Sequence, residues 1–355
     1  MSVNRFPVTG GAEASTALAN ALKILKPHLP ASIPLYRRLQ FGRFFDASCL
    51  LTNLDLTSAS SEKHDGAEAP WLMAFVDRSC RPESEVWLAA SWEYEERDDS
   101  NGERRNGAMT LMRELVQEMK NLPVPISIHQ DVLDAAAAAA AKARAANHNS
   151  TTSQQDDLDS VGLSRNHYGG HAQDSNIMLW GAVHERSLPL LKQLGVLSSK
   201  FQTDHPNFTF VWDVDALRDR TLPEGLRWGK LRREDFALVR SRTQIPRQDR
   251  TMAVLPNLAI FPRDSDQPIS WAFVGLDGSL TTLHVEPAYR GKGLAKTITT
   301  KLFKEKMERF QEDGLPRWAH GYVIVGNQES EGMCRSLGGK SGWEVYWLRV
   351  DLGLV

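Results

Sequence analysis

The stretch "LHVEPAYRGKGLAKTI", residues 283–298, decides the fold of this chain. A β-like run ends at Pro287, an arginine and two glycines follow, and a helix is predicted from about Gly293. Glycines remove the side chains that would keep a ligand from the backbone, and they allow left-handed φ/ψ angles. The first amides of a helix lack intrahelical partners and carry positive partial charge. The stretch therefore predicts a loop that holds a pyrophosphate on backbone N–H groups.

Two other phosphate-binding loops do not fit this spacing. A P-loop needs four residues between its first glycine and a Gly-Lys-Ser/Thr sequence, and this pattern is absent. The dinucleotide fingerprint needs G-x-G-x-x-G near the start of a βαβ unit, whereas Gly291-x-Gly293 lacks the third glycine and follows a predicted hairpin. An ordinary glycine-rich turn is the remaining alternative.

The composition is that of a globular protein with one large or two medium domains. The chain has 355 residues, of which 41% are hydrophobic, and its 42 Lys and Arg nearly balance its 44 Asp and Glu. This balance predicts no broad polyanion-binding surface, so we expect no nucleic-acid partner. Three cysteines, Cys49, Cys80 and Cys334, are too few for a disulfide framework, and we expect free thiols and no metal site.

The sequence also bears on location. The start "MSVNRFPVTGGAEAST" has no apolar core of signal-peptide length, and no stretch reaches the roughly 18 apolar residues of a membrane span. We therefore expect a cytoplasmic protein, with the nucleus as the second choice, and no membrane partner. We further expect a monomer.

The chain divides into two halves at "LPEGL", residues 222–226, which predicts domains at 1–222 and 223–355. In the second half the pattern runs strand, helix, two strands, a hairpin, a strand, a long helix, a strand, a short helix and a last strand. Asp277-Gly278 predicts a tight hairpin in which both turn residues have positive φ. In the first half, the low-complexity residues 131–174 predict a surface insertion that is largely disordered, although their alanines favour helix.

The halves share one order of elements, and matching offsets support a tandem repeat. A residue at the end of a strand is followed by a serine three positions later and by Leu-Gly ten and eleven positions later. These are His184, Ser187 and Leu194-Gly195 in the first half, and Asn327, Ser330 and Leu337-Gly338 in the second. Two short helices that end in glycine could also look alike by chance.

Residues 226–352 resemble the GNAT acyltransferase superfamily. Its acyl-CoA signature, Gln/Arg-x-x-Gly-x-Gly/Ala, is met by Arg290, Gly293 and Ala295. The resemblance implies an α/β (α+β) fold of tandem GNAT-like domains, each a mixed, mostly antiparallel sheet flanked by helices. It implies that a splayed strand pairs with the pantetheine arm and that the loop binds the diphosphate. The residues so implied are Leu283, His284, Val285, Arg290, Gly291, Lys292, Gly293, Leu294, Ala295, Lys296, Asn327 and Ser330.

Two GNAT-like halves, of which only the second carries the signature, resemble the glycine N-acyltransferase group. This resemblance implies an amine or amino-acid acceptor. In the first half, Arg104 and Gly107 are followed by Met109 where glycine or alanine is expected, and the preceding "EYEERDDSNGE" is acidic. We therefore interpret the first half as a repeat that no longer binds CoA and that forms a wall of the acceptor site.

The sequence does not single out one residue as the general base. Ser279 stands where the glycine N-acyltransferases have a glutamate after the hairpin glycine. The candidates are His284, whose reference pKa is about 6.5, Glu286, Tyr322 and a water molecule. Strand alternation puts His284 on the face opposite Ser279, unless a bulge reverses it.

The general acid is open as well. Many relatives have a tyrosine seven residues after the asparagine, and this chain has Cys334 there. A thiol with a reference pKa of about 8.5 could protonate a leaving thiolate. A small buried cysteine is the alternative.

The sequence thus predicts an N-acyltransferase that uses acetyl-CoA or another short acyl-CoA and a small-molecule amine or amino acid. A protein or peptide N-acetyltransferase is the second hypothesis. A module that binds acyl-CoA without turnover is the third.

Overall fold

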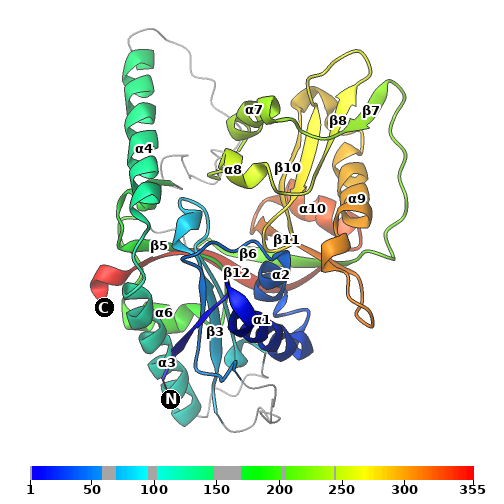
Figure 1. Ribbon diagram of the computed structural model, residues 1–355. Coiled ribbons are helices and arrows are strands. Elements are labelled where there is room, and N and C mark those ends of the chain that lie inside the picture. Colours follow the sequence, from blue (N-terminus) through cyan, green and yellow to red (C-terminus); the bar gives the residue numbers. More distant parts are fainter. Residues whose placement is uncertain (1, 58–68, 95–101, 148–168, 202–204, 244) are drawn as a thin grey trace.

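A computed structural model describes residues 2–57, 69–94, 102–147, 169–201, 205–243 and 245–355. Strands in these ranges alternate with helices in both halves of the chain (Figure 1). The strands are β1 (Asn4–Pro7), β2 (Cys49–Thr52), β3 (Leu72–Val76), β4 (Val86–Ala90), β5 (Ile177–His184), β6 (Asn207–Asp213), β7 (Leu226–Gly229), β8 (Asn257–Pro262), β9 (Ser270–Val274), β10 (Ser279–Val285), β11 (Trp318–Ile324) and β12 (Lys340–Asp351).

The helices flank these strands. They are α1 (Gly11–Leu25), α2 (Ile33–Phe41), α3 (Gly102–Lys120), α4 (Ile126–Asn147), α6 (Leu188–Leu194), α7 (Phe236–Ser241), α8 (Asp249–Met252), α9 (Leu294–Lys306) and α10 (Gln328–Ser336). The sequence patterns predicted the elements of the second half in this order except α8, and they missed β1 and α2 in the first. Helix α2 buries Arg37 and Arg38 together with its apolar residues, so its burial does not follow an apolar period of the sequence.

All of these strands form one sheet, in the order β1-β2-β3-β4-β5-β12-β6-β11-β10-β9-β8-β7. In the first half, β1 to β4 are antiparallel neighbours and β5 lies parallel to β4. The second half repeats this arrangement, with β7 to β10 antiparallel and β11 parallel to β10. The repeated strand directions confirm two GNAT-like halves and the expected mixed, mostly antiparallel architecture.

The two halves exchange their last strands. Strand β12 ends the second half but lies between β5 and β6, the final strands of the first half. Strand β6 in turn lies between β12 and β11, both from the second half. The predicted boundary at 222/223 falls in the connection from β6 to β7, and the sheet runs on across it.

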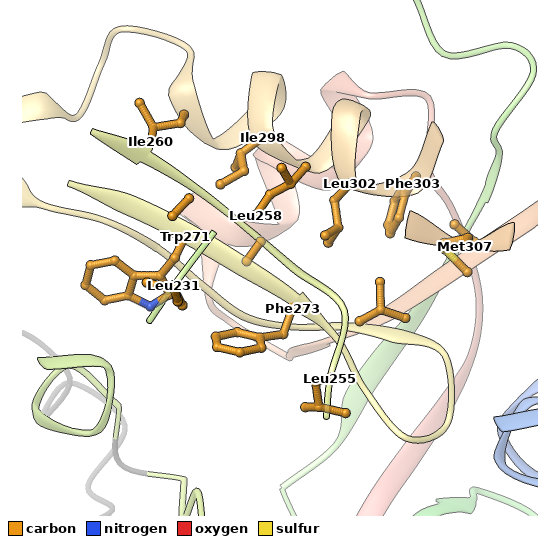
Figure 2. Packing of buried hydrophobic residues seen from close by; sticks show 14 of the residues in the cluster. Leu231, Leu255, Leu258, Ile260, Trp271, Phe273, Ile298, Leu302, Phe303 and Met307 are labelled. Atoms are coloured by element: carbon orange, nitrogen blue, oxygen red, sulfur yellow. The ribbon is translucent and has the colours of Figure 1, made fainter. Parts of the chain in front are cut away.

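One apolar stripe anchors α9 to the sheet of the second half. Leu294, Ile298 and Leu302 follow a four-residue spacing and are at most 1% exposed. Figure 2 shows Ile298 and Leu302 of this stripe above Leu258 of β8, while Trp271 of β9 points to the other side of the strands. Full burial of each such side chain contributes about 1.5–3 kcal/mol, so the helix start, and the loop before it, are fixed against the sheet.

The hairpin between β9 and β10 differs from the prediction. Gly278 has a φ of 76°, but Asp277 is not among the residues with positive φ, so a two-residue turn with two left-handed residues is wrong. Gly278 N–H donates to the Gly275 carbonyl at 2.9 Å, and Gly275 N–H donates to the Ser279 carbonyl at 2.7 Å. These bonds define a three-residue loop that ends in a left-handed glycine.

The insertion is also more ordered than expected. Residues 131–147 belong to α4, a helix that is mostly exposed where its side chains are described. The alanine run explains this outcome, since alanine has the highest helix propensity. Residues 148–168 of the low-complexity segment lie outside the described residues, and its last residues include the short helix Gly170–Gln173. In the described part of the chain, no helix is both long and apolar enough to span a bilayer.

Candidate active site

The loop between β10 and α9 leaves its amides open. Gly291 and Gly293 have φ angles of 76° and 77°, and no other atom lies within 4 Å of the place where a Cβ would stand on either. Among the described residues, none accepts a hydrogen bond from the N–H groups of residues 291–296. Because residues 290–293 are exposed, this row of donors is open to an anion.

Basic side chains border the same loop. The Arg290 Nε atom donates to the Val285 carbonyl at 3.2 Å, and the Lys292 ammonium lies 5.0 Å from the centre of the Tyr289 ring. Lys296 stands in the first turn of α9. Unpaired amides together with three cations fit the chemistry of a diphosphate group.

Strands β10 and β11 part soon after they meet. Their parallel pairing is limited to Ser279 with His320 and Leu280 with Gly321. Strand β11 then continues in register with β6 over its whole length. Among the described residues, 281–285 of β10 have no strand partner on the β11 side, and we call this stretch the β10–β11 opening.

A backbone donor lies on the β10 edge of this opening. Glu286 N–H donates to the Ile269 carbonyl at 2.8 Å, on the β9 side. Successive N–H groups of a strand point to opposite sides, so that of Val285 points into the opening. This is the edge on which the sequence expected the pantetheine arm to pair.

A bulge in β10 places His284 on an unexpected face. The register shifts by one residue between Thr281, paired with Phe273, and His284, paired with Trp271, and Thr282 there has a φ of 54°. Because Phe273 and Trp271 lie on one face of β9, His284 shares the face of Thr281. The prediction from simple alternation is wrong here, because the bulge moves His284 to the other face of the strand. The imidazole stacks on the Trp271 indole, with ring centres 4.6 Å apart.

The His284 ring is available as a proton acceptor. Burial lowers the pKa of His284; the carboxylate of Glu286 opposes this shift, and the charges of Arg290 and Arg242 add to it. The Nε2 atom lies 3.6 Å from a Glu286 carboxylate oxygen and has no hydrogen-bond partner among the described residues. Glu286 itself accepts a bond from Arg242 at 2.9 Å. A neutral imidazole that is held in place suits a general base.

A polar cluster closes the narrow end of the opening. One oxygen of Asp277 accepts bonds from Ser279 Oγ at 2.7 Å and from Ser279 N–H at 3.2 Å. The other oxygen accepts a bond from the Tyr322 hydroxyl at 3.2 Å and lies 3.8 Å from His320 Nε2. Sequence reasoning treated Asp277 as a turn residue and overlooked His320, because only the register of β10 against β11 brings them together.

The charges in this cluster fix its protonation states. Burial alone would raise the pKa of Asp277, but the nearby His320 side chain and the bonds from Ser279 lower it overall. Burial and the Asp277 carboxylate raise the pKa of Tyr322 well above its usual value. The phenol therefore keeps its proton at neutral pH, which disfavours Tyr322 as the base.

Sequence reasoning also missed Arg247, in the connection from α7 to α8. Its Nε donates to Thr282 Oγ1 at 2.9 Å, its Nη2 to Thr281 Oγ1 at 2.7 Å, and its Nη1 to the Pro246 carbonyl at 3.1 Å. A guanidinium has five N–H donors, so one remains on each terminal nitrogen. Within the described ranges, no carboxylate lies within ion-pair distance of this side chain.

The remaining predicted residues lie on or beside α10. The Asn327 side chain accepts a bond from Ser330 N–H at 3.0 Å and thereby caps the helix. Cys334 is 2% exposed and packs in the core of the second half. Burial raises the pKa of its thiol to about 12, with Arg335 lowering and Glu331 raising it. Its assignment as the general acid stays a prediction.

The first half closes its own counterpart of the opening. Strand β4 pairs with β5 over two residues, and the short helix of residues Ser91–Glu93 follows directly. Trp92 Nε1 donates to Ser187 Oγ at 2.9 Å, and the Ser187 hydroxyl donates to Glu93. These bonds join the ends of β4 and β5 across the space that stays open in the second half.

The first-half loop is replaced by helix as well. Arg104, Gly107 and Met109 all lie inside α3, and Met109 is buried in the core. A Cβ on Gly107 would stand 2.9 Å from Pro70, so this glycine serves helix packing. Residues 95–101, most of the acidic stretch, lie outside the described residues.

The fold and this site define a class of protein. Two halves of four antiparallel strands and a parallel fifth, with a glycine loop after the splayed strand of the second, make this a tandem protein of the GNAT superfamily. A family model described as the acyl-CoA N-acyltransferase verG N-terminal domain matches residues 7–212. That match covers more than half of the chain, so the chain belongs to this family.

Several solved structures of low sequence identity are similar to this chain. A Drosophila protein superposes with a TM-score of 0.59 at 12% identity over 98% of both chains. A GCN5-related N-acetyltransferase from Sphaerobacter thermophilus matches with a TM-score of 0.48 at 13% identity, over 99% of this chain and 96% of that one. A tandem GNAT protein from the clavulanic acid biosynthesis pathway gives 0.48 at 10% identity over 99% of both. No curated protein sequence matches the chain.

Proposed function

We propose that this protein transfers an acyl group, acetyl or another short acyl, from acyl-CoA to a small-molecule amine or amino acid. The observation that carries the proposal is the row of unpaired N–H groups at residues 291–296, beside the β10–β11 opening. These donors would hold the diphosphate of the coenzyme. The edge of β10 would pair with its pantetheine arm, as the family resemblance implies.

The residues of the opening support direct transfer. Acyl-CoA supplies an activated thioester, and the N–H group of Val285 would donate to its carbonyl oxygen as negative charge develops. His284 would take a proton from the attacking amine. The coenzyme would leave as its thiolate and take a proton from solvent.

Arg247 supports an amino-acid acceptor. Its guanidinium binds the threonines of the bulge and keeps two unused N–H donors, one on each terminal nitrogen. A planar fork of this kind suits a carboxylate. We therefore expect glycine and other amino acids to be better acceptors than the corresponding amides.

One screen separates the three hypotheses. The purified protein is incubated with acetyl-CoA, or with longer acyl-CoA thioesters, and with panels of amines, amino acids and short peptides, while free thiol is followed. Calorimetry with CoA is run in parallel, and Arg290→Ala with Lys292→Ala serves as the variant of the loop. Products are identified by mass spectrometry.

The outcomes are distinct. Thiol release that depends on a small amine supports the proposal, and release only with peptides favours a protein or peptide N-acetyltransferase. Heat of CoA binding without thiol release on any acceptor favours a binding module. No heat with CoA would overturn the assignment of the loop.

A further inference from the structure

A loop of the first half grips the segment that carries Arg247. The Gln248 side-chain amide donates to the backbone carbonyls of Cys80 at 3.0 Å and Arg81 at 2.6 Å. Arg250 donates to the carbonyl of Ser79. The first half, whose own opening is closed, is therefore bonded directly to a segment beside the opening of the second half.

Glu83 binds the same segment through both of its carboxylate oxygens. One oxygen accepts a bond from Gln248 N–H at 3.0 Å, and the other accepts a bond from the Thr251 hydroxyl at 2.7 Å. These bonds fix the backbone on the C-terminal side of Arg247. The carboxylate thus determines where the guanidinium can reach.

Arg247 in turn holds the bulge of β10. It donates to the hydroxyl groups of Thr281 and Thr282, and Thr282 has a φ of 54°. A β-branched residue rarely adopts a left-handed conformation, and such strain persists only where surrounding contacts enforce it. The two bonds from Arg247 supply contacts of that kind at the residues that precede Leu283.

Electrostatics link Glu83 to Arg247 as well. Burial lowers the pKa of Arg247, and the charge of Glu83, followed by that of Asp277, opposes this shift. Burial raises the pKa of Glu83; Arg247, the bonds from Gln248 and Thr251, and Arg250 oppose it. Each of these two half-buried charges therefore favours the ionised form of the other.

We infer that Glu83 of the first half is a positioning residue of the acyl-transfer site, which acts through the 247–251 segment and Arg247 to hold the β10 bulge. The inference rests on the proposed function for its meaning. In this role the first half, whose own opening is closed, contributes to the site without binding a ligand itself. The bulge sets the direction of the Val285 N–H group. Its position therefore determines how this donor is aimed at the acyl carbonyl.

Hydrogen exchange tests the positioning without any turnover. Glu83→Gln keeps the size of the side chain and an accepting oxygen but removes the charge. We expect the β10 amides that bond to β9 to exchange about tenfold faster in this variant and in Arg247→Lys. Glu234→Gln, the same change at a carboxylate that is 69% exposed, is the matched control and should leave their exchange unchanged.

Turnover then tests the role in transfer. Glu83→Gln should lower kcat about tenfold, with the dissociation constant of CoA unchanged. In the Arg247→Lys background, the same substitution should have no further effect, because the two residues act in series. Unchanged exchange in Glu83→Gln, or an equal loss of kcat in both backgrounds, would overturn the inference. A wild-type protein without turnover would refute only the proposed function, since exchange still decides the positioning.

Discussion

The substitution Gly293→Ala tests the left-handed backbone on which the anion loop depends. Gly293 has a φ of 77°, and a Cβ would meet no other atom within 4 Å. The protein itself therefore imposes no steric clash, and the whole cost comes from the backbone conformation. For a residue with a Cβ this cost is roughly 1–2 kcal/mol.

The cost is divided between folding and binding. If the substituted alanine keeps the left-handed conformation in the free protein, the free energy of unfolding falls by roughly 1–2 kcal/mol. If the loop relaxes instead, the strain returns when CoA binds, and the dissociation constant rises about 5- to 30-fold. The loss of unfolding free energy and the loss of binding free energy together equal the strain energy of the bound loop, so both are measured.

The assay combines calorimetry with CoA and urea denaturation of the free protein. Gly195→Ala is the matched control, because Gly195 has a φ of 70°, lies in equally open space and ends α6 in the first half. It should show the loss of stability and no loss of CoA affinity. A Gly293→Ala protein that matches the wild type in both measurements would refute the reasoning.

Three further predictions concern buried groups. Cys334→Ala should leave kcat unchanged from pH 6 to 9, in a thiol-release assay, and lower the free energy of unfolding by about 1 kcal/mol, as expected for a small group lost from the core. Asp277→Ala should cost about 3 kcal/mol in urea denaturation, because the Ser279 and Tyr322 hydroxyls lose a charged acceptor. Burial raises the pKa of Glu93 to about 8, so the folded state binds this proton more tightly than the unfolded state. As pH rises from about 4.5 to 8, the wild type should therefore lose unfolding free energy relative to Glu93→Gln. A difference between the two proteins that does not depend on pH would contradict this prediction.

Local features of the site followed from the sequence. The strand at 279–285, the glycine loop and the helix from Leu294 were predicted because each has a short-range signal: alternation, glycine spacing and apolar period. Asn327 was found because an offset repeated between the halves. Such signals depend on neighbours in the chain, and they do not require knowledge of which strands pair.

Features that depend on non-local pairing were not predictable in this way. The bulge at Thr282 reverses the face of His284. A β-branched threonine gives no sequence signal that predicts a left-handed φ. The cluster of Asp277, Tyr322 and His320 forms only once β10 and β11 are in register. An Asp-Gly pair followed by serine was visible, but it indicated a turn, and only the partner strand gives its carboxylate a second role.

The exchange of β6 and β12 has a consequence for any attempt to shorten the protein. Without residues 223–355, strand β5 would lose one neighbour and β6 both of its neighbours, and without residues 1–222, strand β11 would lose one and β12 both. Unsatisfied edges of that kind promote aggregation. Neither segment is thus a detachable module, and a shortened chain would have to rebuild the middle of the sheet as well.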